Sequence, residues 1–328
     1  MTDPAPMMRA WQVQDGAEAP QPVTLPRPQP GPGQVGVAIR AAALNFADLL
    51  MLRGQYQDTP PRPYVPGMEA AGLVTATGPG VTSLSVGDRV AVFAGQGALA
   101  EAGVFDADAC WPLPEALDFA TGAALPIAHG TSHLALAHRA GLRAGQVLAV
   151  LGAAGGVGLT AVEIGARLGA RVIACARGTD KLAIARAAGA HEAIDSTDPD
   201  LRQRLRDLGG VDVVYDAVGG AAGAAAFGAL RPGGQFLLIG FAAGAPPDLK
   251  LNHALVKNLT IHGLYWGGYR SLDPALLRAS LTTVLDWAAA GQLRPHIGTR
   301  FGFDDLPQAL ETLRAGRGTG KIVIDMDA

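Results

Sequence analysis

The sequence predicts an α/β protein in which a doubly wound parallel sheet that binds a nucleotide is accompanied by a mostly β domain. An apolar run, Val147–Leu151, is followed at once by a glycine-dense turn and by an apolar helical pattern from 159 to 168. Residues 1–125 are instead rich in proline and glycine and carry short alternating runs, which is typical of a compact β domain. The length of 328 residues allows about two domains, and 49% hydrophobic against 17% charged residues is enough for large cores.

The glycine turn is the most informative feature of the chain. A strand, a glycine turn and a helix in this order form a pyrophosphate site, because free N–H groups at the helix N-terminus attract the phosphate anion. Gly155 and Gly156 let the backbone approach the phosphates, and Gly158 lets the helix pack tightly on the strand. Ala153 replaces the first glycine of the usual G-x-G-x-x-G pattern. The predicted cofactor-binding residues of the turn are Ala153, Gly155, Gly156, Val157 and Gly158.

Alternating strand and helix patterns follow the turn. Strands separated by helical patterns of about 10–15 residues imply right-handed βαβ units and one parallel sheet. Ligands of such sheets bind at the carboxyl ends of the strands, so the residues after each strand, Gly219 among them, are predicted cofactor contacts. Residues 231–234 predict a turn. The predicted strands are Arg171–Ala176, Val211–Asp216, Gln235–Ile239 and Leu259–Leu264, and the predicted helices are Lys181–Ala188 and 220–230.

The residues after the second strand favour NADP(H) over NAD(H). Proteins that prefer NAD usually place an Asp or Glu about 20 residues after the glycine turn, where it binds the ribose 2′-hydroxyl. Here Ala176 is neutral, and Arg177 and Lys181 follow it. Two cations suit the 2′-phosphate that only NADP(H) carries. The alternative is that both side chains are solvated, with Lys181 in the first turn of a helix.

The rest of the chain predicts a second domain built from both ends of the sequence. The short strands expected near the N-terminus are Gln34–Ile39, Ala71–Thr75 and Asp88–Phe93. The prolines from 20 to 32 predict a linker-like entry loop. The tail, which we expect to return to the first domain, contains helices at 275–290 and 306–315 and a strand at Lys321–Ile324. The predicted division places 1–125 and 265–328 in one domain and 126–264 in the nucleotide-binding domain.

Several segments carry a resemblance to a known family. They are Asn45–Asp48 (NFAD), Arg53–Tyr56 (RGQY), Pro66–Gly72 (PGMEAAG), Gly87–Val90 (GDRV), the glycine turn and Gly320–Val323 (GKIV). Through them the chain resembles, over essentially its whole length, zinc-free members of the medium-chain dehydrogenase/reductase superfamily, close to the quinone oxidoreductase (zeta-crystallin) branch. The resemblance implies a GroES-like catalytic domain, a Rossmann domain that binds NADPH, a cleft between them and usually a homodimer.

The resemblance also bears on metal binding. Zinc-dependent relatives have a cysteine in place of Asn45 and a histidine in place of Met68. The two cysteines, Cys110 and Cys175, form no C-x-x-C pair, so no thiolate cage for zinc is predicted. We therefore predict no metal site and no strong Lewis acid to polarise a substrate carbonyl. Hydride addition to an electron-poor quinone or α,β-unsaturated carbonyl needs less help and depends mainly on positioning.

The same resemblance indicates three catalytic residues. The Asn45 amide would donate a hydrogen bond to the acceptor carbonyl or hold the nicotinamide ribose, and the Tyr56 phenol would donate to the substrate or form one wall of the cleft. A hydrogen bond to the carbonyl would stabilise the anion that develops there. Thr131, at the start of a helix after Pro126, would reach the nicotinamide region. The structural alternatives are a turn-capping asparagine, a packing tyrosine and a threonine N-cap.

Further residues are predicted to contact the cofactor. Phe241 and Trp266 follow strand ends and would flank the nicotinamide, with core packing as the alternative. Arg317, between Gly316 and Gly318, would help to bind the 2′-phosphate or is solvated. Ser196 stands where many relatives have a tyrosine that stacks on adenine, so the adenine would be held differently.

Three functions remain open from the sequence alone. The first is NADPH-dependent reduction of a quinone, the second is NADPH-dependent reduction of an enone or enoyl thioester, and the third is low-turnover NADPH binding in a structural or sensing role. The expected partner is a small-molecule electron acceptor. A net charge of −3 without a basic block argues against nucleic acid and anionic membranes. The chain shows no long apolar run and no signal-peptide pattern, which predicts a cytoplasmic protein.

Overall fold

The computed structural model describes residues 6–17 and 19–326 and divides them into two compact units. Unit 1 comprises the described residues up to Ile127, Leu285–Gly291 and those from Ile297 onward. Unit 2 comprises Ala128–Val284 and Gln292–His296.

The extent of unit 2 differs from the predicted boundary at 264, because the unit continues to Val284. Two contacts tie the additional segment to the helix that begins unit 2. A Cβ atom added at Gly130 would lie 2.5 Å from Cζ2 of Trp266, so the indole packs directly on this glycine. Further along, Ser280 Oγ lies 2.8 Å from Nδ1 of His133. Residues 265–284 therefore belong with the nucleotide-binding fold.

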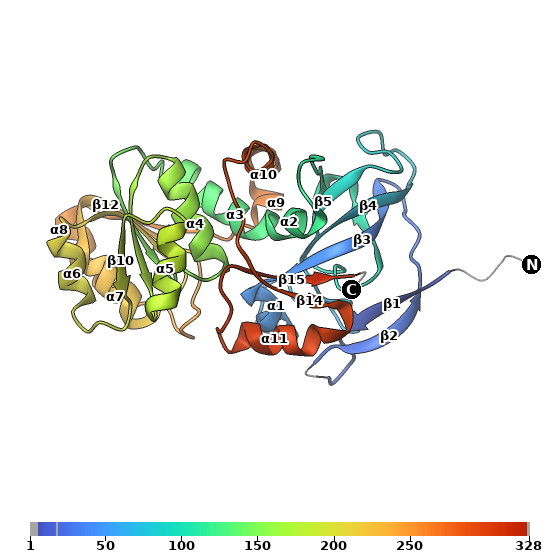
Figure 1. Ribbon diagram of the computed structural model, residues 1–328, viewed down its shortest axis with the longest axis horizontal. Coiled ribbons are helices and arrows are strands. Elements are labelled where there is room, and N and C mark those ends of the chain that lie inside the picture. Colours follow the sequence, from blue (N-terminus) through green and yellow to red (C-terminus); the bar gives the residue numbers. More distant parts are fainter. Residues whose placement is uncertain (1–5, 18, 327–328) are drawn as a thin grey trace, which may run out of the picture. The chain divides into compact units, whose positions relative to one another are not determined.

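Unit 2 is built on a six-stranded sheet in which all the pairings are parallel. The strand order is β10-β9-β8-β11-β12-β13, and it reverses direction between β8 and β11. Helices cover both faces of the sheet (Figure 1), which confirms the predicted doubly wound fold. The strands are β8 (Val147–Leu151), β9 (Arg171–Ala176), β10 (Glu192–Asp195), β11 (Val211–Asp216), β12 (Leu230–Leu238) and β13 (Thr260–Gly263).

The helices of this part of the chain follow from burial and close packing. All five residues of β8 are buried, which explains their unbroken apolar run. A Cβ atom at Gly165 would lie only 2.4 Å from the side chain of Leu148, so this glycine lets α4 approach the sheet. The helices are α3 (Pro126–His133), a π-helix (Leu134–Arg139), α4 (Gly156–Arg167), α5 (Thr179–Ala187), α6 (Leu201–Asp207), α7 (Gly220–Ala229), α8 (Leu251–Lys257), α9 (Tyr269–Leu272) and α10 (Pro274–Ala289).

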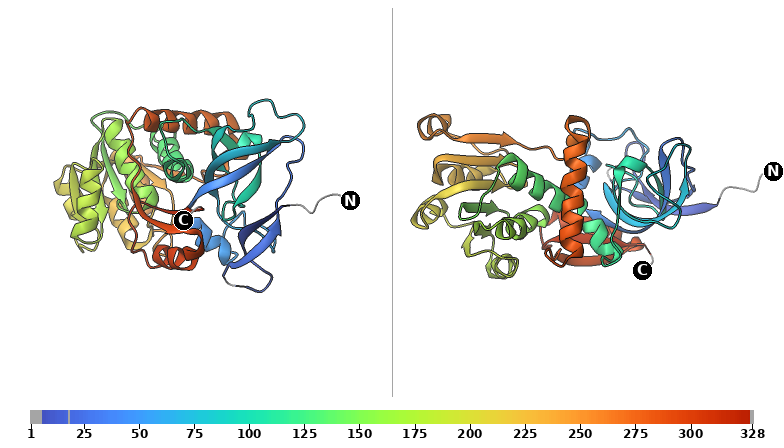
Figure 2. Two further views of the ribbon diagram at one scale, coloured as in Figure 1. Left: turned by 45° about the vertical axis from the view of Figure 1, so that its right-hand side comes forward. Right: turned by 90° about the horizontal axis from the view of Figure 1, so that it is seen from above.

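Unit 1 contains a seven-stranded sheet and a separate two-stranded one, which appear in blue, cyan and red in Figure 2. Within the larger sheet, β15 near the C-terminus pairs antiparallel with β3 near the N-terminus. The end of the tail thus returns to the first domain as expected, whereas residues 265–284 belong to unit 2. The strands are β1 (Met7–Gln12), β2 (Gln21–Pro26), β3 (Gln34–Leu44), β4 (Glu69–Thr77), β5 (Arg89–Phe93), β6 (Ala102–Asp106), β7 (Cys110–Pro112), β14 (Ile297–Gly302) and β15 (Lys321–Asp325).

Three α-helices and two short 3₁₀ turns complete the elements of unit 1. They are α1 (Phe46–Leu52), α2 (Phe119–Ala124), α11 (Leu306–Arg314) and the turns Ala107–Ala109 and Phe303–Asp305. No helix in the described ranges is both long enough and apolar enough to cross a membrane.

Two local predictions were wrong. The proline-rich segment is not wholly a linker, because Gln21–Pro26 forms β2, with Pro22 opposite Trp11 and Pro26 opposite Met7. Proline is tolerated there because an edge strand leaves some N–H groups without a ladder partner. The turn predicted at 231–234 is part of β12, which begins at Leu230 and has an irregular register against β11.

Candidate functional site

The glycine turn joins β8 to α4 as the sequence predicted. Gly152 has a φ of +70°, a left-handed conformation that favours glycine. A Cβ atom at Gly158 would lie 2.2 Å from the carbonyl oxygen of Gly152, so a larger residue would force α4 away from the strand. Gly155 is the N-cap of α4, and the N–H groups of the first helical turn have no acceptor within the helix. The turn is thus closely packed and presents backbone donors.

Two neighbouring loops meet the glycine turn at the carboxyl edge of the sheet. The N–H of Ala153 donates to the carbonyl of Cys175 at the end of β9, at 3.1 Å. On the other side, a Cβ atom at Gly152 would lie 2.9 Å from the side chain of Val218, in the loop after β11. The ends of β8, β9 and β11 therefore lie together, at the position where doubly wound sheets bind ligands.

The loop after β11 is held by a buried carboxylate. Asp216 Oδ1 accepts hydrogen bonds from the N–H groups of Val218, at 2.9 Å, and of Gly219, at 2.8 Å. Gly219 has a φ of +75°, and an added Cβ atom would lie 2.4 Å from the carbonyl oxygen of Ala245 and 3.1 Å from the ring of Phe241. The structure thus brings the predicted residues Gly219 and Phe241 together, although Phe241 is 42% exposed and is not a core aromatic residue.

The two predicted phosphate-binding cations follow β9. Arg177 is exposed, and Lys181 lies in the first turn of α5. Partial burial, together with repulsion from Arg177, lowers the pKa of the Lys181 ammonium. The repulsion shows that the two cations are close enough for their charges to interact, and two neighbouring cations suit a phosphate group.

Thr131 lies on α3, next to Gly130, the residue against which Trp266 packs. Thr131 is 8% exposed and lies well inside the helix, which begins at Pro126. It therefore does not serve as an N-cap, which removes one structural alternative. Trp266 packs against the adjacent Gly130 and is 4% exposed.

Asn45 lies in a buried polar cluster of unit 1. Its Nδ2 donates to Glu69 Oε1 at 2.8 Å, and its Oδ1 accepts from the ammonium of Lys321 at 2.7 Å. Lys321 also donates to Glu69 Oε1 at 2.6 Å and to the carbonyl of Leu44 at 2.9 Å. The second carboxylate oxygen of Glu69 accepts from the N–H of Ile127 at 2.7 Å. The cluster was missed by sequence reasoning, which quoted Lys321 only as part of a terminal motif.

Asp48 adds a second buried carboxyl to this cluster. Its Oδ2 accepts from the N–H of Asn45 at 2.7 Å, while Oδ1 is buried without a hydrogen-bond partner among the described residues. Burial raises the pKa of Asp48 to about 7, although the hydrogen bond from Asn45 and the charge of Lys321 oppose the rise. Asp48 thus orders the start of α1.

Two predicted residues have other surroundings. Tyr56 is half-buried in the mostly exposed loop after α1, where its carbonyl accepts from Thr59 Oγ1 at 2.6 Å. Arg317 is exposed in the loop after α11 and belongs to unit 1, whereas Arg177 and Lys181 belong to unit 2. The predicted roles of Tyr56 and Arg317 stay predictions.

The side chains that could bind a metal ion in the described residues do not suit zinc. Cys110 and Cys175 are both buried and belong to different units. Burial raises the pKa of Cys175 to about 12, which disfavours the thiolate that would bind a metal. Among residues 6–17 and 19–326, no three His, Cys, Asp or Glu side chains are grouped as metal ligands. At Glu69 the neighbouring cation is the Lys321 ammonium.

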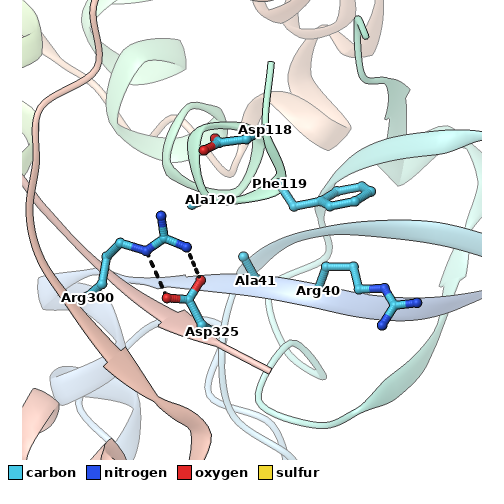
Figure 3. A pocket seen from close by; sticks show the side chains of 7 residues that line it. All are labelled: Arg40, Ala41, Asp118, Phe119, Ala120, Arg300 and Asp325. Carbon is cyan, nitrogen blue, oxygen red and sulfur yellow. Dashed lines mark hydrogen bonds and ion pairs between the residues drawn. The ribbon is translucent and has the colours of Figure 1, made fainter. Parts of the chain in front are cut away.

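A cavity of about 460 Å³ in unit 1 involves none of the predicted site residues (Figure 3). Arg300 donates two hydrogen bonds to the Asp325 carboxylate, at 2.8 and 2.7 Å, and Asp118 caps α2 by accepting from the N–H of Thr121. Arg300, Asp325 and Asp118 thus already form hydrogen bonds within the wall of the cavity. Its lining is Arg40, Ala41, Asp118, Phe119, Ala120, Arg300 and Asp325.

Comparison with known proteins places the chain in a family. Residues 31–115 match the alcohol dehydrogenase GroES-like domain, and residues 188–324 match the family described as zinc-binding dehydrogenase. The quinone oxidoreductase-like protein 2 homolog of Nematostella vectensis is 39% identical over 301 residues, which cover 90% of this chain and 82% of that protein. Mouse (Mus musculus) quinone oxidoreductase-like protein 2 is 34% identical over 97% of this chain and 95% of its own length.

A solved structure agrees in fold as well as in sequence. The quinone oxidoreductase of Thermus thermophilus, solved also in complex with NADPH, is 33% identical, with a TM-score of 0.85 over 97% of this chain and 100% of that one. The family description names zinc, but the described residues contain no group of three His, Cys, Asp or Glu side chains that could hold a metal ion. The likeness extends over nearly the full length of chain and relatives, and it shows that this chain is an oxidoreductase of the quinone oxidoreductase branch of the medium-chain dehydrogenase/reductase superfamily.

Proposed function

We propose that this protein reduces a quinone-type acceptor with NADPH and without a metal ion. The observation that carries the proposal is the cation pair Arg177 and Lys181, which follows β9 beside the glycine turn. The family membership supports an oxidoreductase, and the names of the relatives support a quinone as the acceptor.

The residues of unit 2 fit NADPH. The pyrophosphate would be held by the backbone donors at the start of α4, which the close packing of Gly158 brings against β8. Arg177 and Lys181 would hold the 2′-phosphate through charge-assisted hydrogen bonds. Thr131 and Trp266 would contact the nicotinamide, as the family resemblance implies. When bound, NADPH supplies the hydride, and the chain supplies orientation and exclusion of water.

Asn45 is the proposed hydrogen-bond donor to the acceptor. Its amide cannot turn over, because Oδ1 faces the Lys321 ammonium, which can only donate. One N–H of Nδ2 donates to Glu69 Oε1, at 2.8 Å. The Asn45 side chain also hydrogen-bonds to the Asp48 carboxyl, and in this proposal its second N–H turns from Asp48 to the acceptor oxygen. A fixed donor of this kind stabilises an oxyanion that develops on the acceptor.

The first experiment is NADPH oxidation by the chelator-treated protein, with 1,4-naphthoquinone and a simple enone compared at matched concentrations. Faster consumption of the quinone is the expected result. Faster consumption of the enone would replace the proposal by alkene reduction, and NADPH binding without oxidation of either acceptor would favour a binding role. The implied homodimer stays a prediction that sedimentation analysis tests.

A substitution of either cation tests the cofactor preference. Arg177→Ala or Lys181→Ala is expected to weaken NADPH binding about ten- to a hundredfold, because a hydrogen bond to a charged group contributes about 1.5–3 kcal/mol. The affinity for NADH, which lacks the 2′-phosphate, should change little. Fluorescence titration with both nucleotides measures the effect, and Arg186→Ala, an exposed cation near the end of α5, is the matched control. Equal weakening of NADPH and NADH would exclude a role at the 2′-phosphate.

A further inference from the structure

Three buried hydroxyl groups meet inside unit 2. They belong to Ser132 on α3, Thr160 on α4 and Tyr215 on β11. Ser132 Oγ lies 2.7 Å from Thr160 Oγ1 and 3.0 Å from Tyr215 Oη. Ser132 and Tyr215 are 0% exposed and Thr160 is 5% exposed. We refer to these three residues as the hydroxyl cluster, and none of them was predicted from the sequence as a site residue.

The number of available protons decides which hydroxyl of the cluster donates and which accepts in each hydrogen bond. Each hydroxyl has one proton to donate. Among the described residues, Ser132 is the one hydrogen-bond partner of the Tyr215 phenol. Because an unsatisfied buried donor is costly, the phenol donates its proton to Ser132 Oγ. Ser132 then donates to Thr160 or to the carbonyl of Val157, at 3.0 Å. Thr160 in turn donates to the carbonyl of Ala128, at 3.0 Å, or of Val157, at 2.9 Å.

The hydroxyl cluster fastens α3 to the first turn of α4. On α3 it holds the Ala128 carbonyl and the Ser132 side chain, which are one helical turn apart. On α4 it holds the carbonyl of Val157, which belongs to the predicted pyrophosphate site. Thr131, the predicted nicotinamide contact, lies between the two attachment points on α3. Tyr215 anchors the arrangement on β11, the strand next to β8.

We propose that the hydroxyl cluster is a positioning device for hydride transfer, which sets the register of α3 on α4 and thereby the place of Thr131 relative to the glycine turn. The inference rests on the proposed function, in which Thr131 and the glycine turn hold two parts of one NADPH molecule. A displacement of about 1 Å costs on the order of a hundredfold in rate, so the register governs the rate more than it governs the affinity.

Two substitutions remove single hydroxyls while keeping the side-chain shape. Tyr215→Phe and Thr160→Val are each expected to lower the single-turnover rate of hydride transfer about ten- to a hundredfold. The dissociation constant of NADPH, measured by fluorescence titration, should stay near the wild-type value. Thr160→Ser restores the hydroxyl and should restore the rate. Tyr64→Phe changes a buried tyrosine of unit 1 and serves as the matched control.

A second readout does not depend on activity. In the absence of NADPH, amide hydrogen exchange of peptides covering Pro126–His133 should be faster in Tyr215→Phe and Thr160→Val than in the wild type. Thr160→Ser and Tyr64→Phe should keep the wild-type exchange. Circular dichroism checks that each variant is folded before either readout is interpreted.

Two results would overturn the inference: an unchanged transfer rate in both hydroxyl-deleting variants, or a loss of NADPH affinity as large as the loss of rate. Failure of the proposed function is distinguishable from both. If the wild type oxidises no NADPH with any acceptor, the proposed function fails, and the exchange of α3 amides alone decides whether the hydroxyl cluster fixes this helix.

Discussion

At the scale of single residues, the environment of Asn45 converts a flexible amide into a fixed donor. Lys321 and Glu69 are 3% and 0% exposed, and their contact at 2.6 Å is a buried ion pair. Removing one partner of such a pair leaves an uncompensated buried charge, which makes both residues costly to change. Asn45 is the member of the cluster that can be shortened without breaking the ion pair, so it is the best position for a functional test.

Asn45→Ala is expected to lower kcat by about a hundred- to a thousandfold, the usual effect of removing one oxyanion donor. The dissociation constant of NADPH should change little, because Asn45 belongs to unit 1 whereas the glycine turn and the cation pair belong to unit 2. Steady-state kinetics with the preferred acceptor and a fluorescence titration measure the two quantities. Asn252→Ala, an exposed residue on α8, is the control. Unchanged turnover would remove Asn45 from the proposed mechanism.

Asp48 should make unit 1 less stable as the pH rises. Its folded-state pKa of about 7 lies above the value of about 3.9 in an unfolded chain, so the folded state binds the proton more tightly. The contribution of Asp48 to the free energy of unfolding therefore falls between about pH 4 and pH 7, by on the order of 4 kcal/mol, and is constant above that range.

Asp48→Asn tests whether Asp48 makes the free energy of unfolding fall as the pH rises. An asparagine oxygen can still accept from the N–H of Asn45, but it does not ionise. The stability difference, variant minus wild type, should grow from pH 4 to pH 7 in urea unfolding experiments. Asp15→Asn, an exposed change in the same unit, should give a flat difference. A flat difference for Asp48→Asn as well would show that this carboxyl is ionised in the folded protein near pH 4.

At the scale of elements, the strand–turn–helix unit from β8 to α4 depends on backbone contacts that glycine alone permits. Gly158 and Gly155 are close in sequence but differ in their surroundings. A Cβ atom at Gly158 would lie 2.2 Å from the Gly152 carbonyl oxygen, whereas a Cβ atom at Gly155 would lie 3.4 Å from the same oxygen. The first contact is impossible without moving the helix, and the second needs only a small adjustment.

Gly158→Ala is therefore expected to lower the free energy of unfolding by about 1–3 kcal/mol, as overpacking does, and to weaken NADPH binding. Gly155→Ala should keep the wild-type stability. Gly155→Asp should remain folded but lose NADPH, because a carboxylate would occupy the proposed phosphate site. Urea unfolding and nucleotide titration of the three variants measure this pattern. Retention of NADPH by Gly155→Asp would refute the assignment of the phosphate site.

At the scale of the whole molecule, two units with separate cores carry separate parts of the proposed function. The residues predicted for the pyrophosphate and for the cation pair lie in unit 2, and the Asn45 cluster lies in unit 1. NADPH at a hundred times its dissociation constant should stabilise the form that binds it by about 2.7 kcal/mol. Hydrogen exchange should slow first in peptides covering Val147–Arg167, the region from β8 through α4.

The matched comparison for this prediction is Gly155→Asp, which should show no slowing at the same NADPH concentration. NADH at that concentration should give a smaller effect than NADPH. If protection by NADPH occurred only in unit 1, the cofactor assignment would be wrong, and a nucleotide site would have to be sought there.

Local patterns in the sequence were sufficient for most of unit 2. β8, β9 and β11 have the predicted limits, because central parallel strands are buried on both faces and are therefore mostly apolar, with β8 as an unbroken apolar run. The glycine turn was equally recognisable, because its tight contacts involve residues only a few positions apart. Short edge elements were harder to predict: β2 contains prolines and looked like a linker, and β14 was not predicted at all.

The sequence by itself determined the fold class and the strand, glycine turn and helix from β8 to α4, because these depend on periodicity and on glycine positions within short segments. Only the tertiary structure decided that Lys321 and Glu69 fix the amide of Asn45, across 276 and 24 positions of the chain. It also decided that Ser132, Thr160 and Tyr215 meet, and that residues 265–284 belong with unit 2. Buried polar contacts of this kind arise when distant elements pack and must satisfy one another's hydrogen bonds, and no local pattern records which partners will meet.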